Sequence, residues 1–200
     1  MGVGCPGRAD QTGGDAVLDE KVESMLSVLA AQGPAAEHAP QLMLYGQFVG
    51  AWQGTVVVYR QDGTRREESC EVSFGWVLEG RAIQDVWIAP ARNDRATPGR
   101  DASKDMYGTT IRVYDPERDI WDSTWIAPGT QSYGRMTGRR DGDDILQEYR
   151  DEDGALWQWC FTEITDDSFH WIARSSEDDG ATWRLRNEFF LSRSPVQTES

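Results

Sequence analysis

Alternation of large apolar and polar positions dominates the chain from about residue 51 onward. Within residues 155–162, Trp157, Trp159 and Phe161 fall on one face of an extended strand. Successive side chains of a β-strand point to opposite faces, so this spacing is typical of a strand with one face in a core. Residues 183–191 repeat the alternation. The pattern predicts β-structure over most of the chain.

Ten segments carry such strand signals, being rich in Val, Ile, Thr, Trp, Tyr and Phe. They span residues 51–60, 64–77, 81–90, 106–114, 119–126, 131–139, 143–150, 155–163, 168–175 and 182–192. Most are joined by short turns such as Asp62-Gly63 and Asp141-Gly142, which favours antiparallel neighbours because parallel ones need long crossovers. A meander of this length usually closes, since closure removes exposed edges. We therefore predict an all-β fold: a single antiparallel ten-stranded barrel with an N-terminal helical extension.

The first 40 residues differ from the rest and are predicted to be a flexible N-terminal extension, with the barrel domain spanning residues 41–200. Residues 16–32 carry apolar residues at helical spacing and predict one amphipathic helix. This extension lies across the barrel as a lid, joins two copies in a homodimer, or is a loosely attached appendage. Residues 41–49 are compatible with a second, short helix. The long connection at 91–104 is a candidate gate at a barrel mouth.

Charge and composition narrow the classes of partner. Twenty Lys and Arg stand against 34 Asp and Glu, a net charge of −14, which argues against nucleic-acid and anionic-membrane partners. No secretory signal pattern and no apolar run of membrane-spanning length occurs in the sequence, so we expect a cytoplasmic protein. Two histidines and three cysteines without metal-ligand spacing predict no metal site. The lack of a Gly-rich strand–helix turn predicts no nucleotide cofactor.

Three separated motifs carry a resemblance over about residues 44–193. They are Phe48-Val49-Gly50-Ala51-Trp52, Arg112-Val113-Tyr114-Asp115-Pro116 followed by Trp121 and Trp125, and Asp179-Gly180 with Thr182-Trp183. In order and spacing they resemble an uncharacterised bacterial family of lipocalin-like (calycin-type) barrels. This resemblance implies a barrel with an internal cavity for a small molecule. Residues 176–183 also look like the Asp-box of sialidases; occurring once, this motif predicts only a hairpin turn.

Polar residues among aromatic ones on strand faces are the candidates for chemistry inside a barrel. Asp85 is a candidate general acid, because burial disfavours the charged form of a carboxyl group. Arg112 is a candidate for holding a developing oxyanion, and Glu148 is a second proton carrier. Asp85 and Arg112 are equally compatible with a structural ion pair, and Glu148 with a solvated outer face.

Six further residues are predicted to contact the ligand: Trp87, Tyr107, Trp125, Tyr133, Trp159 and His170. The indoles offer flat faces for stacking, and the phenols offer hydrogen bonds. His170 is a base, an axial ligand if the barrel holds haem, or an ordinary strand histidine. One sequence does not fix which strand face points inward.

These features support three functional hypotheses. The first is a cyclase or isomerase that needs no organic cofactor and acts on a hydrophobic polyketide- or terpene-like intermediate. The second is a non-catalytic carrier of a small hydrophobic molecule. The third, a haem barrel, depends on His170. The first two rest on analogy with other barrels and on the general finding that small molecules bind in largely apolar cavities with a few polar groups.

Overall fold

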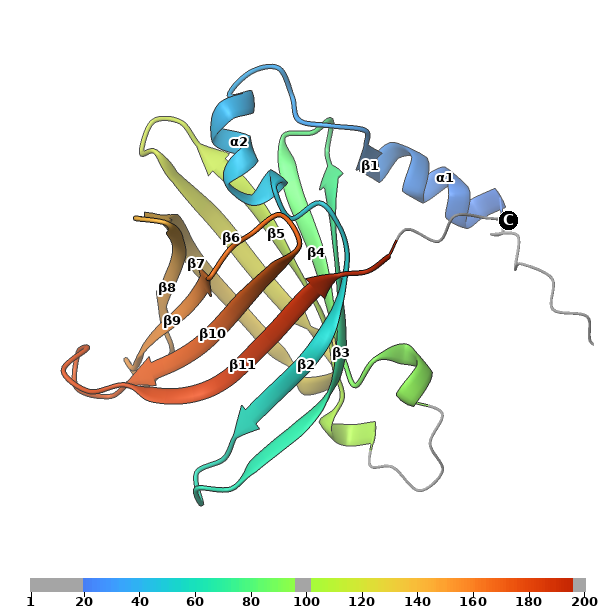
Figure 1. Cartoon of the computed structure of the whole chain (residues 1–200). Helices are drawn as coiled ribbons and strands as arrows, with labels where there is room; N and C mark the ends of the chain where they lie inside the picture. Colours follow the sequence, from blue (N-terminus) through green and yellow to red (C-terminus); the bar gives the residue numbers. More distant parts are fainter. Residues whose placement is uncertain (1–19, 96–101, 196–200) are drawn as a thin grey trace, which may run out of the picture.

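The computed structural model describes residues 20–95 and 102–195, and in them the ten predicted strands form a closed antiparallel barrel (Figure 1). The strands are β2 (Gly50–Tyr59), β3 (Arg65–Val77), β4 (Ala82–Ala89), β5 (Met106–Asp115), β6 (Ile120–Ala127), β7 (Ser132–Asp141), β8 (Asp144–Arg150), β9 (Leu156–Thr162), β10 (Ser168–Ser176) and β11 (Arg184–Arg193). Each pairs with the next along the chain, and β11 pairs with β2 to close the ring. The predicted fold class is confirmed.

The N-terminal part of the described chain is a helix followed by a short strand. Helix α1 (Glu20–Leu29) ends earlier than the predicted 16–32, because β1 (Ala30–Ala31) pairs with the end of β3. None of the α1 residues is buried, and Met25 and Leu26 on its apolar face are exposed. The predictions for residues 1–19 lie outside the described residues.

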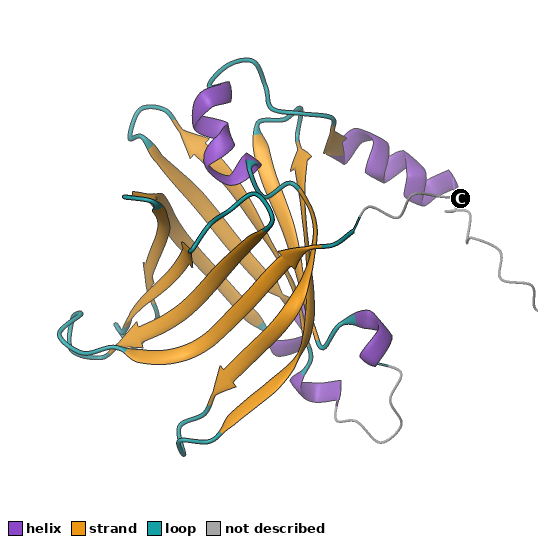
Figure 2. Ribbon diagram, in the orientation of Figure 1, coloured by secondary structure: helices purple, strands orange, loops and turns teal. Residues whose placement is uncertain are grey.

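Helix α2 (Ala39–Gly46) closes one end of the barrel (Figure 2). Its Tyr45 is fully buried and makes edge contacts with Trp121 and Phe161. Phe48 follows the helix into the core and accepts a hydrogen bond on its carbonyl oxygen from Nε1 of Trp52, at 2.7 Å. The half of the barrel beside α2 is therefore a packed aromatic core.

In the connections of the described chain lie three short 3₁₀ helices: η1 (Arg92–Asp94), η2 (Ala102–Lys104) and η3 (Pro128–Thr130). The first two belong to the predicted gate at residues 91–104, of which 96–101 lie outside the described residues. The gate therefore stays a prediction.

The Asp-box-like segment forms the predicted hairpin turn between β10 and β11. Asp178 accepts hydrogen bonds from the amide and the hydroxyl of Thr182, at 2.8 and 2.6 Å. The amide of Gly180, at a φ of +93°, donates to Oγ of Ser176. This positive φ suits glycine, so the motif is accounted for by turn geometry.

Candidate functional site

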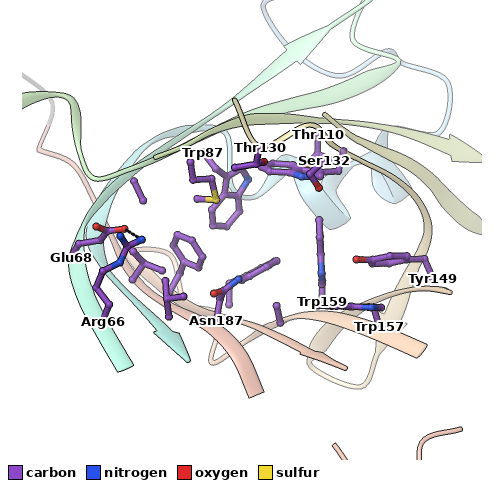
Figure 3. Close-up of a pocket in the computed structure, with 18 of the residues that line it drawn as sticks. Arg66, Glu68, Trp87, Thr110, Thr130, Ser132, Tyr149, Trp157, Trp159 and Asn187 are labelled. Atoms are coloured by element: carbon purple, nitrogen blue, oxygen red, sulfur yellow. Dashed lines mark ion pairs between the residues drawn. The ribbon is translucent and has the colours of Figure 1, made fainter. Parts of the chain in front are cut away.

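A cavity of about 420 Å³ occupies the half of the barrel away from α2 (Figure 3). Seven aromatic rings line it: Trp87, Trp125, Tyr149, Trp157, Trp159, Trp171 and Phe189. Thr130 and Ser132, which also line it, are exposed at the barrel end, so the cavity reaches the protein surface. Its volume lies within the range of about 300–1,000 Å³ typical of small-molecule sites.

The aromatic wall is continuous around much of the cavity. Ring centroids are 5.3 Å apart for Trp87 and Trp171, 5.4 Å for Trp159 and Trp171, and 5.8 Å for Trp125 and Trp159. Tyr149 makes an edge contact with Trp159. Mutual packing of this kind fixes ring orientation, so the wall offers flat apolar surfaces that are already in place.

An ion pair and an amide sit on the wall nearer the surface. Arg66 and Glu68 of β3 form a pair at 2.9 Å, on the side of the cavity opposite Tyr149 and Trp157 (Figure 3). Asn187 of β11 lies between these two groups in the same view. The positive and negative charges of the pair balance, so this part of the wall carries no net charge.

The inner end of the cavity is a buried polar layer centred on Arg112. Its Nη1 donates to Oδ2 of Asp85 at 2.5 Å, and its Nε donates to Oε1 of Gln147 at 3.2 Å. All three side chains are almost fully buried. The second oxygen of Asp85 accepts the Thr110 amide at 2.7 Å. Asp85 and Arg112 thus form an ion pair, and their catalytic roles stay predictions.

Aromatic faces enclose the guanidinium from the α2 side. Its carbon lies 4.9 Å from the ring centroid of Tyr45, 5.7 Å from that of Phe161 and 6.0 Å from that of Phe74. The Tyr45 hydroxyl donates to Gln147 at 3.1 Å. The polar layer therefore joins the aromatic core to the cavity.

Two hydroxyls beside Arg112 lack a partner among the described residues. Oγ1 of Thr110 and Oγ of Ser123 are buried and make no hydrogen bond. Thr110 belongs to the cavity lining, whereas Ser123 is the cross-strand neighbour of Arg112 and does not line the cavity. Unpartnered buried hydroxyls are uncommon. This layer therefore has hydrogen-bonding groups that the fold itself does not use.

Burial shifts the titration of the phenols around the site. It raises the pKa of Tyr149 to about 12, with a further rise from the charge of Asp151. It also raises the pKa of Tyr45 above its usual value, although the Arg112 charge acts in the opposite direction. Both phenols are therefore neutral hydrogen-bonding groups at physiological pH.

Five of the nine predicted site residues lie in or beside the cavity. Trp87, Arg112, Trp125 and Trp159 line it, and Asp85 lies directly behind Arg112. Asp85 itself is fully buried and does not line the cavity. The structure therefore brings three of the predicted stacking indoles together with Arg112 in one cavity lining.

The other four predicted residues lie elsewhere. Glu148 is on the outer face, bonded to Arg139 and Gln158; burial raises its pKa, but these bonds outweigh burial and lower it overall. Tyr107 and Tyr133 are exposed by 49% and 66%. These three side chains do not reach the cavity, because the alternation of each strand turns them outward.

His170 also lies on the outer face of the barrel. It stacks on Phe190 with ring centroids 4.3 Å apart, and its Nε2 lies 3.1 Å from Oε1 of Glu188. The neighbouring Phe169 and Trp171 point inward. The haem hypothesis required His170 inside the barrel, so the geometry removes its basis.

Sequence reasoning did not select several cavity residues, among them Trp157, Trp171 and Thr110. The alternation already placed Trp157 on the face of Trp159, and Trp171 on the face of Phe169 and Ala173. Those signals were present but could not be oriented without the closed barrel. Thr110 carried no chemical signal of its own.

Within the described ranges, no group of three or more His, Cys, Asp or Glu side chains is placed to hold a metal ion. Among the helices of that same part of the chain, none is long and apolar enough to cross a membrane.

Comparison with known structures finds other proteins with a similar fold. It is similar to the S-type phycobiliprotein lyase CPES from Guillardia theta, with a TM-score of 0.50 and 12% identity over 76% of this chain and 91% of that chain. It is also similar to Rv2717c from M. tuberculosis, with a TM-score of 0.49 and 15% identity over 78% and 98% of the two chains. No known protein family and no curated protein matches the sequence. At these identities the likeness concerns the fold alone.

Proposed function

We propose that this protein binds a small, largely apolar molecule with a flat aromatic or conjugated body inside the barrel. The observation that carries the proposal is the ring of seven aromatic side chains around a cavity of about 420 Å³. Flat ligands stack well on such walls, and each aromatic pair contributes about 0.5–1.5 kcal/mol beyond the burial of its area.

The charges of the lining favour an uncharged ligand. Arg66 is paired with Glu68, and Arg112 is paired with Asp85. No net charge is left to compensate that of an ion, and burying an uncompensated charge is strongly unfavourable. The acidic surface of the chain gives no attraction for anions either.

Blocking the cavity tests the proposal. Val58 lines the cavity on β2, so Val58→Trp places a large ring in it. Val113 is 45% exposed, and Val113→Trp adds the same ring outside the cavity as a matched control. The probe is 2-ethylnaphthalene. Its binding is measured by quenching of tryptophan fluorescence and by native mass spectrometry.

We expect the wild type and Val113→Trp to bind the probe equally, and Val58→Trp to bind it at least about tenfold more weakly. Circular dichroism checks that both variants keep the barrel. Equal binding by Val58→Trp, or no binding by the wild type of any flat apolar probe, would refute the proposed function. Native mass spectra of freshly purified protein also reveal any molecule retained from the host.

The second candidate function is the cofactor-independent cyclase or isomerase. The observation that favours it is that Arg112 lines the cavity while holding the Asp85 carboxylate behind it. Arg112 would stabilise developing negative charge on a ligand oxygen, and Asp85, which does not line the cavity, would hold the guanidinium in position.

Hydrogen exchange in deuterated water tests this second candidate. A methyl ketone such as 2-acetylnaphthalene would exchange its methyl hydrogens faster in the presence of the wild type than in the presence of Val58→Trp. NMR follows the exchange. Asp85→Asn should reduce the enhancement, because the Asp85 carboxylate holds the Arg112 guanidinium in position. Binding without any enhanced exchange would leave the non-catalytic carrier as the function.

A further inference from the structure

We propose that the cavity selects a ligand with an uncharged carbonyl oxygen at its inner end, held by the guanidinium of Arg112 with the hydroxyl of Thr110. This inference rests on the proposed function and names the chemical class of its ligand. The apolar body of the molecule lies along the indole wall, and its oxygen points toward the polar layer.

Arg112 has donor capacity that the protein does not use. A guanidinium carries five N–H groups, and the contacts of Arg112 with Asp85, Gln147 and Tyr45 do not use all of them. Arg112 is 1% exposed, yet it lines the cavity. A buried donor with unused hydrogens at the inner end of an apolar cavity is suited to an acceptor oxygen on a ligand.

Thr110 adds a second polar group at the same place. Its hydroxyl makes no hydrogen bond to the described part of the chain, although the residue lines the cavity next to Arg112 on β5. The hydroxyl hydrogen of Thr110 can rotate about the Cβ–Oγ1 bond to meet an acceptor. A carbonyl oxygen beside Arg112 gives it a partner that the protein alone does not supply.

Charge balance distinguishes a carbonyl from a carboxylate. Asp85 already neutralises Arg112, and both of its oxygens accept hydrogen bonds. A ligand carboxylate would add a second negative charge to a layer that is neutral without it, and buried uncompensated charge is costly. A ketone, aldehyde, quinone, ester or amide oxygen uses the same donors and leaves the layer neutral.

Three probes of one shape separate these possibilities. They are 2-acetylnaphthalene, which carries a carbonyl; 2-ethylnaphthalene, which carries no oxygen; and 2-naphthoate, which carries a charge. Binding is measured by quenching of tryptophan fluorescence, and the carbonyl stretch of ¹³C-labelled 2-acetylnaphthalene is followed by infrared difference spectroscopy. We expect 2-naphthoate to bind at least about tenfold more weakly than the ketone, and the ketone stretch to fall in frequency on binding.

Variants of the polar layer then test the residues. Thr110→Val keeps the shape and removes the hydroxyl, and Arg112→Lys keeps the positive charge toward Asp85 without the guanidinium fork. We expect ketone affinity to fall about 3- to 10-fold in Thr110→Val and about 10-fold or more in Arg112→Lys, with 2-ethylnaphthalene unchanged. Ser123→Ala is the matched control, since it removes a buried unpartnered hydroxyl that does not line the cavity.

The outcomes separate the two proposals. If no probe binds, the proposed function fails and this inference with it. If all probes bind, but 2-naphthoate binds as well as the ketone or the ketone responds equally to Thr110→Val and Ser123→Ala, the inference is overturned while the proposed function stands. Because Thr110 makes no side-chain hydrogen bond to the described residues, Thr110→Val should unfold at an unchanged or higher temperature.

Discussion

Replacing Arg112 with methionine should leave the Asp85 carboxylate buried without a counter-charge. The Asp85 side chain is completely enclosed, and Arg112 supplies its only ion pair in the described structure, at 2.5 Å. After the substitution the carboxylate keeps the hydrogen bond from the Thr110 amide. One backbone donor does not replace a paired cation in a site without solvent.

The expected loss is large because the pair is enclosed on every side. Removing one partner of a buried pair costs about 3–5 kcal/mol, whereas a surface pair contributes about 0–1 kcal/mol. In a domain of 200 residues, this corresponds to a fall in Tm of roughly 6–20 °C. The aromatic faces of Tyr45, Phe74 and Phe161 around the guanidinium place the loss toward the upper end.

Urea unfolding followed by fluorescence and circular dichroism measures the effect. With a slope of about 2–3 kcal/mol per M, the midpoint of Arg112→Met should fall by roughly 1–2.5 M. The double variant Asp85→Asn, Arg112→Met should lose less than the two single variants added together, by about 2 kcal/mol or more. Arg118→Met, which breaks two ion pairs near the surface, with Asp115 and Asp122, should cost no more than about 1 kcal/mol per pair.

A loss for Arg112→Met no larger than that for Arg118→Met would refute the reasoning. Strict additivity in the double variant would refute it as well, because it would mean that the two side chains do not stabilise each other.

Three further predictions concern titration and backbone packing. Burial raises the pKa of Tyr149 to about 12, so above pH 10 the folded protein keeps a phenol proton that the unfolded chain loses. The resulting contribution to stability is complete below about pH 10 and is lost between about pH 10 and pH 12. Urea midpoints measured across that range would show this loss. Hydrogen bonds from Thr182 and Ser176 lower the pKa of Asp178 to about 2, so Asp178→Asn should lower Tm at pH 7, and the difference from wild type should shrink as pH falls from 4 to 2. A Cβ at Gly54 would overlap the Phe190 carbonyl oxygen, so Gly54→Ala should destabilise the barrel by about 2 kcal/mol or more in urea unfolding.

Each of these predictions has a control. Tyr149→Phe should flatten the loss of stability between pH 10 and 12, and an unchanged slope would contradict the assignment. Glu177→Ala, in the same turn, should not show the acid dependence expected for Asp178. A Cβ at Gly75 meets nothing within 4 Å, so Gly75→Ala should be tolerated; equal effects at Gly54 and Gly75 would show that the close approach is unimportant.

The strands were predictable because two local signals agree along the chain. β-branched and aromatic residues alternate with polar ones, and glycine or aspartate marks the turns, as in Asp62-Gly63 and Asp141-Gly142. Both signals depend on neighbouring residues only. The closed antiparallel barrel then followed from the short connections, and all ten segments agree with the structure to within about two residues at each end, a normal uncertainty for strand boundaries.

The inner face was harder to predict, because alternation defines two faces without saying which one is enclosed. Tyr107 and Tyr133 were expected inside, but their strands turn glycines inward instead. At Gly108 the Trp125 ring fills the space that a side chain would need, and Gly134 is paired across from the same tryptophan. A large residue on one strand thus selects a glycine on the next, which a single-strand pattern does not reveal.

Partners distant in sequence were the other limit. Asp85 and Arg112 are 27 residues apart, and Tyr45 and Gln147 are 102 apart. The ion pair could be named as an alternative because its two strands are neighbours along the chain. The contact from α2 to β8 could not, since it depends on the helix closing the end of the barrel. The amphipathic pattern of α1 likewise predicted a helix. It did not predict that none of the described residues covers the apolar face of that helix.

The indole wall has an optical consequence as well as a steric one. Trp125, Trp159, Trp171 and Trp87 form a chain in which each ring centroid lies less than 6 Å from the next. At such separations the excited states of neighbouring indoles couple, so excitation of one ring spreads along the chain. The wall should therefore give an exciton couplet in far-ultraviolet circular dichroism, where indole absorbs most strongly, and a guest that absorbs at the emission wavelength of indole should quench the rings that it contacts.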